Sequence, residues 1–178
     1  MERRKVEIFT GKVFKVPSHI VRLDHEATHG WQVRYGKPWK MFSDHTNDGS
    51  GARKSLAEAI DELAKRVKRL PAPTGLRTAV SVNKTSSLPV GISGPKLRQR
   101  ESKGTAYCEF QVTYPVVGSK SKNTHVYIGT QNTVTKEKIE AALAKAIALR
   151  NKHVKKYQQA SNQAIRLRAA ALGVVRAA

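Results

Sequence analysis

Short runs of alternating apolar and polar residues predict three strands in the first third of the chain. The clearest run spans residues 30–36, because the side chains of a strand point alternately to opposite faces. One face of this run is apolar and consists of Trp31, Val33 and Tyr35. Segments 19–24 and 38–42 are the other two expected strands. The polar side chains of the middle strand, Gln32 and Arg34, are therefore expected to point away from the core.

A helical pattern follows these strands, at residues 53–69. Its apolar positions recur every three or four residues and form one stripe, which consists of Leu56, Ile60, Leu63 and Val67. Pro71 and Pro73 end the helix. Three strands and one helix bury only one face of a sheet, so we expect the other face to be exposed.

The same order of elements recurs in the second half of the chain. The first strand is expected within segment 89–100, and the other two are expected at 106–114 and 125–130. A helix is expected to begin at Thr135, as its N-cap, with Glu137 in its first turn. This helix is expected to run to about Tyr157. The basic, alanine-rich sequence that follows can extend the helix.

The sequence therefore predicts an α+β protein made of two tandem units, each a three-stranded antiparallel sheet packed on one α-helix. The first unit with its N-terminal extension is expected at 1–70, the second at 88–160, and a basic C-terminal helix or tail at 161–178. The proline- and glycine-containing segment 71–87 is the expected linker. The C-terminal helix is a candidate contact for a homodimer.

The charge of the chain indicates a polyanionic partner. Thirty-three Lys and Arg residues against thirteen Asp and Glu give a net charge of +20 and an isoelectric point near 10.4. Residues 71–178 carry most of it, with eighteen basic and four acidic residues. Basic side chains that neutralise phosphates release counterions, and this release favours binding to nucleic acid.

Several function classes are not expected from the sequence. No apolar run approaches the ~20 residues that a membrane-spanning helix needs, and the first residues lack the apolar core of a signal peptide. We therefore expect a cytoplasmic, nucleoid-associated protein without a membrane partner. The single cysteine, Cys108, excludes an internal disulfide and is expected to be a small core residue.

One motif raises the question of catalysis. Residues 25–29 spell His-Glu-Ala-Thr-His, which on a helix places two imidazoles on one face, where they can bind zinc beside a general-base glutamate. The motif lies between two expected strands, however, in a hairpin turn where that shared face is lost. We therefore expect no metal site, no cofactor, no catalytic residue and no enzyme activity.

The second half of the chain resembles a known family of DNA-binding domains. Its segments "GIS", "YCEFQV", "HVYIGT" and "TVTKEKIEAALAKAIALR" are similar, in this order, to the plant ethylene-response-factor domain (the APETALA-two class) and its bacterial and phage relatives. The first half resembles bacterial members through "IVRLDHEATHGWQVRYG" and "WKMFSD". The resemblance covers about residues 18–70 and 88–152. It implies a sheet that docks in the major groove of DNA.

The resemblance also implies which side chains contact DNA, namely those that point outward from the strands. In the first half these are Arg22, Gln32 and Arg34. In the second half they are Lys96, Arg98, Arg100, Glu109, Gln111, His125 and Tyr127. Tyr127 stands where the plant family has a tryptophan, so the base preference of the family does not carry over.

The sequence therefore predicts a non-catalytic double-stranded-DNA-binding protein, either a transcriptional regulator or an accessory factor of a mobile element. Two alternatives share the charge. One is an RNA-binding or ribosome-associated protein, which is expected to expose aromatic residues on its sheet for stacking. The other is an architectural protein that coats DNA without base discrimination.

Overall fold

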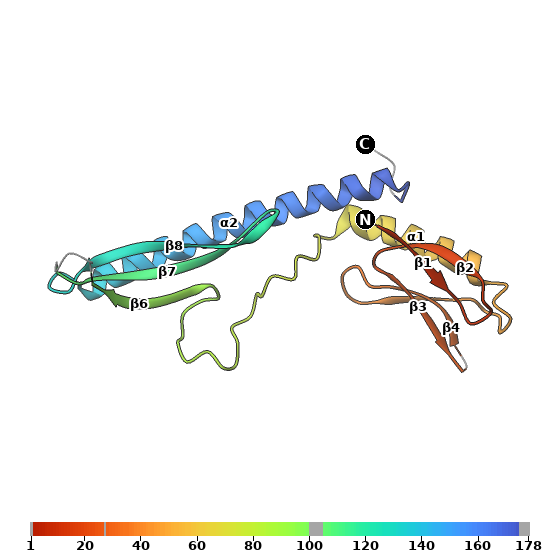
Figure 1. The fold of residues 1–178 in the computed structure, drawn as a ribbon, viewed down its shortest axis with the longest axis horizontal. Helices are drawn as coiled ribbons and strands as arrows, with labels where there is room; N and C mark the ends of the chain where they lie inside the picture. Colours follow the sequence, from red (N-terminus) through yellow and green to blue (C-terminus); the bar gives the residue numbers. More distant parts are fainter. Residues whose placement is uncertain (1, 27, 100–104, 175–178) are drawn as a thin grey trace. The chain divides into compact units, whose positions relative to one another are not determined.

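The computed structural model describes residues 2–26, 28–99 and 105–174 and divides the chain into two compact units. Unit 1 combines Met1–Thr74 with Ser161–Ala178, and unit 2 is Gly75–Ala160. In each unit, strands lie against helical segments, as Figure 1 shows.

Unit 1 contains two antiparallel sheets and a complete helix, α1. Its three-stranded sheet has the order β3 (Ile20–His25), β4 (Thr28–Val33) and β5 (Lys40–Ser43). Helix α1 (Ala52–Arg69) begins directly after Gly51, whose backbone lies close to the preceding loop. A Cβ atom at Gly51 would lie 1.9 Å from the carbonyl oxygen of Asp44, so glycine is required where the chain enters this helix.

The core of unit 1 confirms the predicted apolar faces. Trp31, Val33 and Tyr35 are fully buried. They pack with the stripe of α1, of which Leu63 and Val67 are also fully buried. The indole Nε1 of Trp31 donates a hydrogen bond of 2.8 Å to the carbonyl oxygen of Ala52, which satisfies its only polar group in the core.

The predicted architecture of two tandem units, each with one three-stranded sheet on one helix, is wrong. The described residues form three antiparallel sheets, of two, three and three strands, and two helices. The additional sheet pairs β1 (Arg3–Glu7) with β2 (Val13–Pro17). This hairpin contributes apolar side chains to the core of unit 1, where Phe14 meets the Trp31 ring edge to face.

The second helix also differs from the prediction, because it belongs to both units. Helix α2 runs over 36 residues, Lys136–Ala171, and its residues from Ser161 onward lie in unit 1. There the apolar side chains Ile165, Ala169, Leu172 and Val174 join the core of that unit. The side chain of Asn162 accepts a hydrogen bond of 2.7 Å from the backbone of Ala72. The C-terminal segment proposed as a homodimer contact thus uses these apolar residues within its own chain.

Unit 2 contains the third sheet and the first part of α2. The sheet has the order β6 (Ile92–Arg98), β7 (Tyr107–Val116) and β8 (Ser119–Thr130). Its inner face carries Phe110 and Val112, which pack with Ala142 and Ala146 of the helix. Thr135 precedes the helix and its hydroxyl accepts a hydrogen bond from the backbone of Lys138, as expected of an N-cap.

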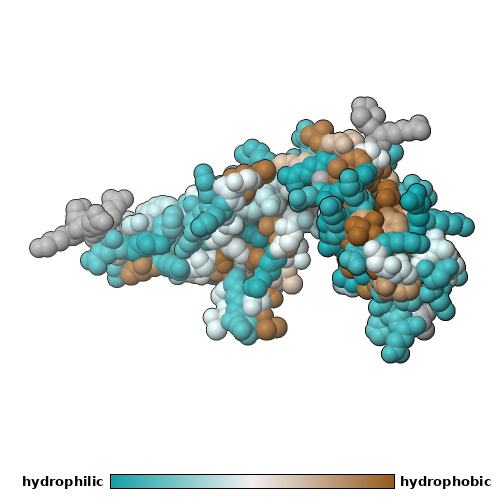
Figure 2. Space-filling view, turned by 45° about the vertical axis from the view of Figure 1, so that its right-hand side comes forward, coloured by the Kyte–Doolittle hydropathy of each residue, from teal (hydrophilic) through white to brown (hydrophobic). Residues whose placement is uncertain are grey.

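Figure 2 shows hydrophilic residues over most of the visible surface, with hydrophobic residues interspersed among them. Within the described parts of the chain, no helix combines the length and the apolar character that crossing a membrane requires.

Candidate nucleic-acid interface

We call the face of the unit 2 sheet that points away from α2 the outer face of unit 2. The strand register brings most of the predicted contact residues onto it. Gln111 of β7 lies opposite His125 of β8, and Glu109 lies opposite both Lys96 of β6 and Tyr127 of β8. Arg98 pairs with Tyr107 at the adjoining position of the same two strands. Residues from three strands therefore meet within one patch, as their alternation predicts.

Glu109 lies at the centre of this patch and is almost completely buried, with 7% of its side chain exposed. Its Oε1 atom accepts a hydrogen bond of 2.6 Å from Nε of Arg98 and lies 2.7 Å from Nδ1 of His125. A buried carboxylate needs such partners, because an unpaired charge is costly away from water. Glu109 thus fixes two neighbours and is not itself presented to a ligand.

Arg98 keeps donors for an outside partner. A guanidinium has five N–H donors, and only the one on Nε is directed at Glu109. The side chain is 45% exposed, so its terminal nitrogens reach solvent. A guanidinium whose Nε donates to a carboxylate can use its terminal nitrogens for bidentate recognition of a guanine edge or a phosphate.

The remaining members of the patch add further polar and aromatic groups. Lys96 donates a long hydrogen bond of 3.4 Å to the amide oxygen of Gln111. Tyr127 is 56% exposed, and its ring centroid lies 6.3 Å from that of Tyr107. Arg100, which the sequence also assigns to this interface, lies outside the described residues.

Arg22 of unit 1 points the opposite way from its predicted direction. It pairs in register with the buried Trp31, and its guanidinium lies 4.9 Å from the centroid of that ring, so it belongs to the inner face. It makes two hydrogen bonds to Asp44, at 2.6 and 3.1 Å, and one to Asp24. Only 5% of its side chain is exposed, which leaves it no access to a phosphate.

The charged state of this arginine is favoured by its partners. Burial alone lowers the pKa of a guanidinium, but the hydrogen bonds to Asp44 and Asp24 outweigh it and raise the pKa of Arg22. The hydroxyl of Ser55 on α1 also donates to Asp44. This network therefore links β3 to α1 and is structural.

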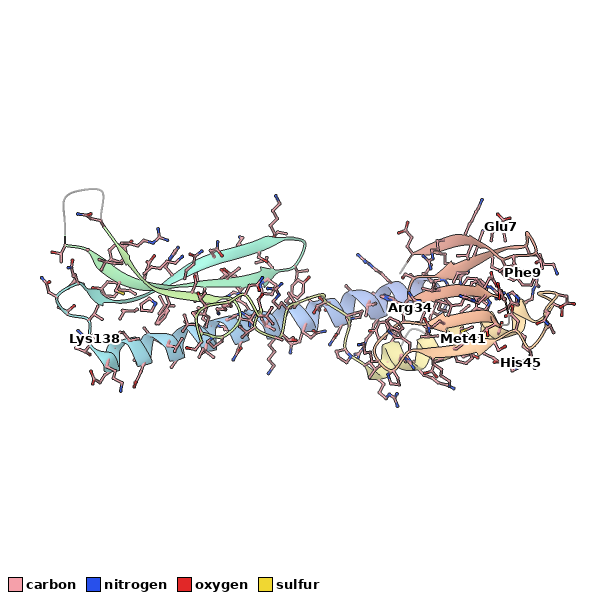
Figure 3. All side chains as sticks on the ribbon, turned by 90° about the horizontal axis from the view of Figure 1, so that it is seen from below. Glu7, Phe9, Arg34, Met41, His45 and Lys138 are labelled. Atoms are coloured by element: carbon pink, nitrogen blue, oxygen red, sulfur yellow. The ribbon has the colours of Figure 1, made fainter. Side chains whose placement is uncertain are left out.

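Gln32 and Arg34 point outward, on the face of the unit 1 sheet turned away from α1. Arg34 and Met41 lie on this face in Figure 3. Nε of Arg34 donates to the amide oxygen of Gln32 at 2.7 Å, and its guanidinium stacks 4.8 Å from the ring centroid of Trp39. Trp39 is 53% exposed. This face offers a single outward arginine beside apolar and aromatic surface.

The described residues of the His-Glu-Ala-Thr-His motif lie at the end of the β3–β4 hairpin. His25 is the last residue of β3 and pairs with Thr28, while His29 lies opposite Asp24. Nδ1 of His29 lies 2.9 Å from Oδ1 of Asp24, and its ring stacks on Phe9 with centroids 4.0 Å apart. Across the described segments, no three His, Cys, Asp or Glu residues are grouped so that they could bind a metal ion.

Comparisons of the chain with models of protein families, with curated proteins and with solved structures find no match.

Proposed function

We propose that the protein binds double-stranded DNA without catalysis, as a transcriptional regulator or an accessory factor of a mobile element. One observation carries the proposal: Lys96, Arg98, Gln111 and His125 converge on one outer face around the buried Glu109. Their side chains include the groups that recognise base edges, since arginine and lysine pair with guanine and glutamine pairs with adenine. A small sheet can present such groups to the major groove.

The charge of the chain supports the same partner. At +20, the protein attracts any phosphate backbone, and eighteen of its basic residues follow residue 70. Phosphate contacts fix the position of a protein on DNA, whereas base contacts discriminate between sequences. In this proposal the lysines and arginines outside the patch attract the phosphate backbone. The outer face of unit 2 discriminates between base sequences. The resemblance to the ethylene-response-factor domain supports this division.

A second candidate function, binding of single-stranded RNA, is favoured by the two tyrosines on the same face. Tyr127 is largely exposed and Tyr107 lies beside it. Unpaired bases stack on aromatic side chains at about 1–3 kcal/mol per base. Duplex DNA offers no free base faces, so a stacking role for this pair would point to a single-stranded nucleic acid such as RNA.

Selection from a random duplex DNA pool, with a structured RNA pool in parallel, tests the proposal. We expect enrichment of a short duplex motif and no enriched RNA. The affinity for the enriched duplex should fall steeply with salt, with a log–log slope of roughly −5 if about six phosphates are contacted. Enrichment of RNA loops alone would favour the second candidate. An affinity that does not change with salt concentration would show that phosphate contacts contribute little to binding of either DNA or RNA.

A further inference from the structure

A groove in unit 2 lies on the opposite side of the sheet from the candidate interface. It opens between the far end of the β7–β8 hairpin and α2, and its cavity volume is about 470 Å³. Tyr114 of its lining continues the inner-face series of Phe110 and Val112 along β7. The lining residues are Tyr114, Pro115, Val116, Val117, Lys122, His153, Lys156, Tyr157 and Ala160.

The groove has the charge of an anion site. Lys122 comes from β8, Lys156 comes from α2, and both are exposed. His153 of α2 is the third nitrogen-bearing side chain, and none of the lining residues is acidic. Among the ion pairs of the described residues, none involves Lys122 or Lys156. Two ammonium groups from facing elements suit one compact anion such as a phosphate.

The rest of the lining is apolar and aromatic. The imidazole of His153 stacks on the ring of Tyr114, with centroids 3.9 Å apart and planes inclined by 23°. Tyr157 lines the same groove, and Val117 leaves 56% of its side chain in solvent. Flat aromatic and aliphatic surface of this kind suits a planar ring, because a nucleobase can stack on any aromatic face.

We propose that this groove binds a free nucleoside monophosphate, with the phosphate between Lys122 and Lys156 and the base against the aromatic wall. The volume lies within the range of about 300–1,000 Å³ that is typical of small-molecule sites. The lining favours a nucleotide over an acidic peptide, since two lysines match one phosphate and the aromatic residues need a planar partner. Because the groove lies on the helix side of the sheet, a duplex on the outer face would not occupy it. The site is therefore independent of the proposed DNA binding.

Titration calorimetry of the full chain with adenosine monophosphate (AMP) at low ionic strength tests this site. We expect saturable binding with a dissociation constant below about 1 mM. Adenosine and inorganic phosphate alone should each bind at least about tenfold more weakly, because each lacks half of the contacts. An oligonucleotide that displaces AMP only when its end is phosphorylated would show that the site binds strand ends and would overturn the free-nucleotide proposal.

Variants assign the binding to the groove. Lys122→Ala and Lys156→Ala should each weaken AMP binding by at least about fivefold, since each removes a charge-assisted hydrogen bond. Tyr157→Leu should weaken AMP but not inorganic phosphate. Lys120→Ala is the matched control, because Lys120 lies two residues from Lys122 on β8 and does not line the groove. All four side chains are at least partly exposed, and unchanged melting temperatures confirm folding.

Two results would overturn the proposal. One is no detectable heat or chemical-shift change with AMP at concentrations of about 1 mM. The other is binding that the double change of Lys122 and Lys156 to alanine leaves intact, which would place AMP elsewhere on this basic chain.

Discussion

Glu109 is the residue on which the outer face of unit 2 depends. It is an acidic side chain within a basic surface, and its buried carboxylate is contacted by Arg98 and His125. By accepting a hydrogen bond from Arg98 it fixes the direction of that guanidinium. Glu109 is therefore a positioning residue in the proposed interface, although the sequence assigns it a direct contact with DNA.

Replacement of this carboxylate should separate discrimination from attraction. Glu109→Gln keeps the size of the side chain and removes its charge, so the charge-assisted hydrogen bond that orients Arg98 becomes weaker. We expect the preference for the selected duplex over random duplex to fall by about 1–3 kcal/mol. Affinity for random duplex should stay equal or rise, because a negative charge is lost. Equal weakening on both duplexes, at an unchanged melting temperature, would contradict the positioning role.

Asp24 should make the stability of unit 1 depend on pH. Burial raises the pKa of Asp24, but hydrogen bonds from Arg22 and His29 outweigh it, so its pKa lies below the ordinary value of 3.8. A carboxyl with a lowered pKa stabilises the folded state above its ordinary value, and this contribution is lost as the pH falls through the folded value. Asp24→Asn should therefore reduce the loss of unfolding free energy between about pH 7 and about pH 3. Equal losses in both proteins, measured by urea unfolding, would exclude Asp24 as a source.

The face of the sheet toward which a side chain points was predictable where apolar burial alone determines it. Trp31, Val33 and Tyr35 alternate, and a sheet with one covered face must bury them. Arg22 was not predictable, because Val21 and Leu23 flank it and make it resemble an outward residue. Its inward direction depends on Asp44, which lies 22 residues further on and becomes its partner only in the folded chain.

At the scale of elements, the strands and helices could be predicted where one of their faces is buried in a core, because burial produces a regular apolar pattern. Strand β8 is longer than its apolar alternation indicates. The expected strand begins at residue 125, whereas β8 begins at Ser119. The earlier start is not visible in the sequence, because Lys120 and Lys122 are exposed and give no apolar alternation. The β1–β2 hairpin was missed for a similar reason, since basic residues make up most of β1.

The stripe of α1 should account for much of the stability of unit 1. Leu63 is fully buried, so Leu63→Ala removes apolar contacts and leaves a cavity. We expect a loss of about 2–5 kcal/mol in unfolding free energy. Leu167→Ala on α2 is the matched control, because this side chain is 64% exposed and its loss should change stability by about 0.5 kcal/mol or less. Similar losses for the two variants, measured by chemical unfolding, would show that the core is assigned incorrectly.

At the scale of the whole molecule, α2 gives the chain an organisation that alternation cannot reveal. Its first part completes the core of unit 2, and its last turns complete the core of unit 1. The sequence predicts that this region is helical, but a helical period does not indicate which sheet each turn covers. The two units are therefore not consecutive along the chain.

A charge placed in the last turns of α2 should affect unit 1 alone. Ala169 is fully buried in the core of unit 1, so Ala169→Asp places a carboxylate there without a partner. Hydrogen exchange should become faster in β3, β4 and α1. Exchange in β7 should remain as in the wild type. Faster exchange in β7 together with unit 1, or no change in either, would contradict the division of the chain.

Whether the outer face of unit 2 discriminates between DNA sequences is measured by the affinity of Arg98→Ala for the selected and the random duplex at one salt concentration. Lys145→Ala is the matched control, because Lys145 is exposed on α2, away from this face. We expect Arg98→Ala to lose about 1–3 kcal/mol on the selected duplex and much less on random duplex, while Lys145→Ala weakens both slightly and equally. Wild-type affinity of a folded Arg98→Ala variant for the selected duplex would show that this face does not discriminate between DNA sequences.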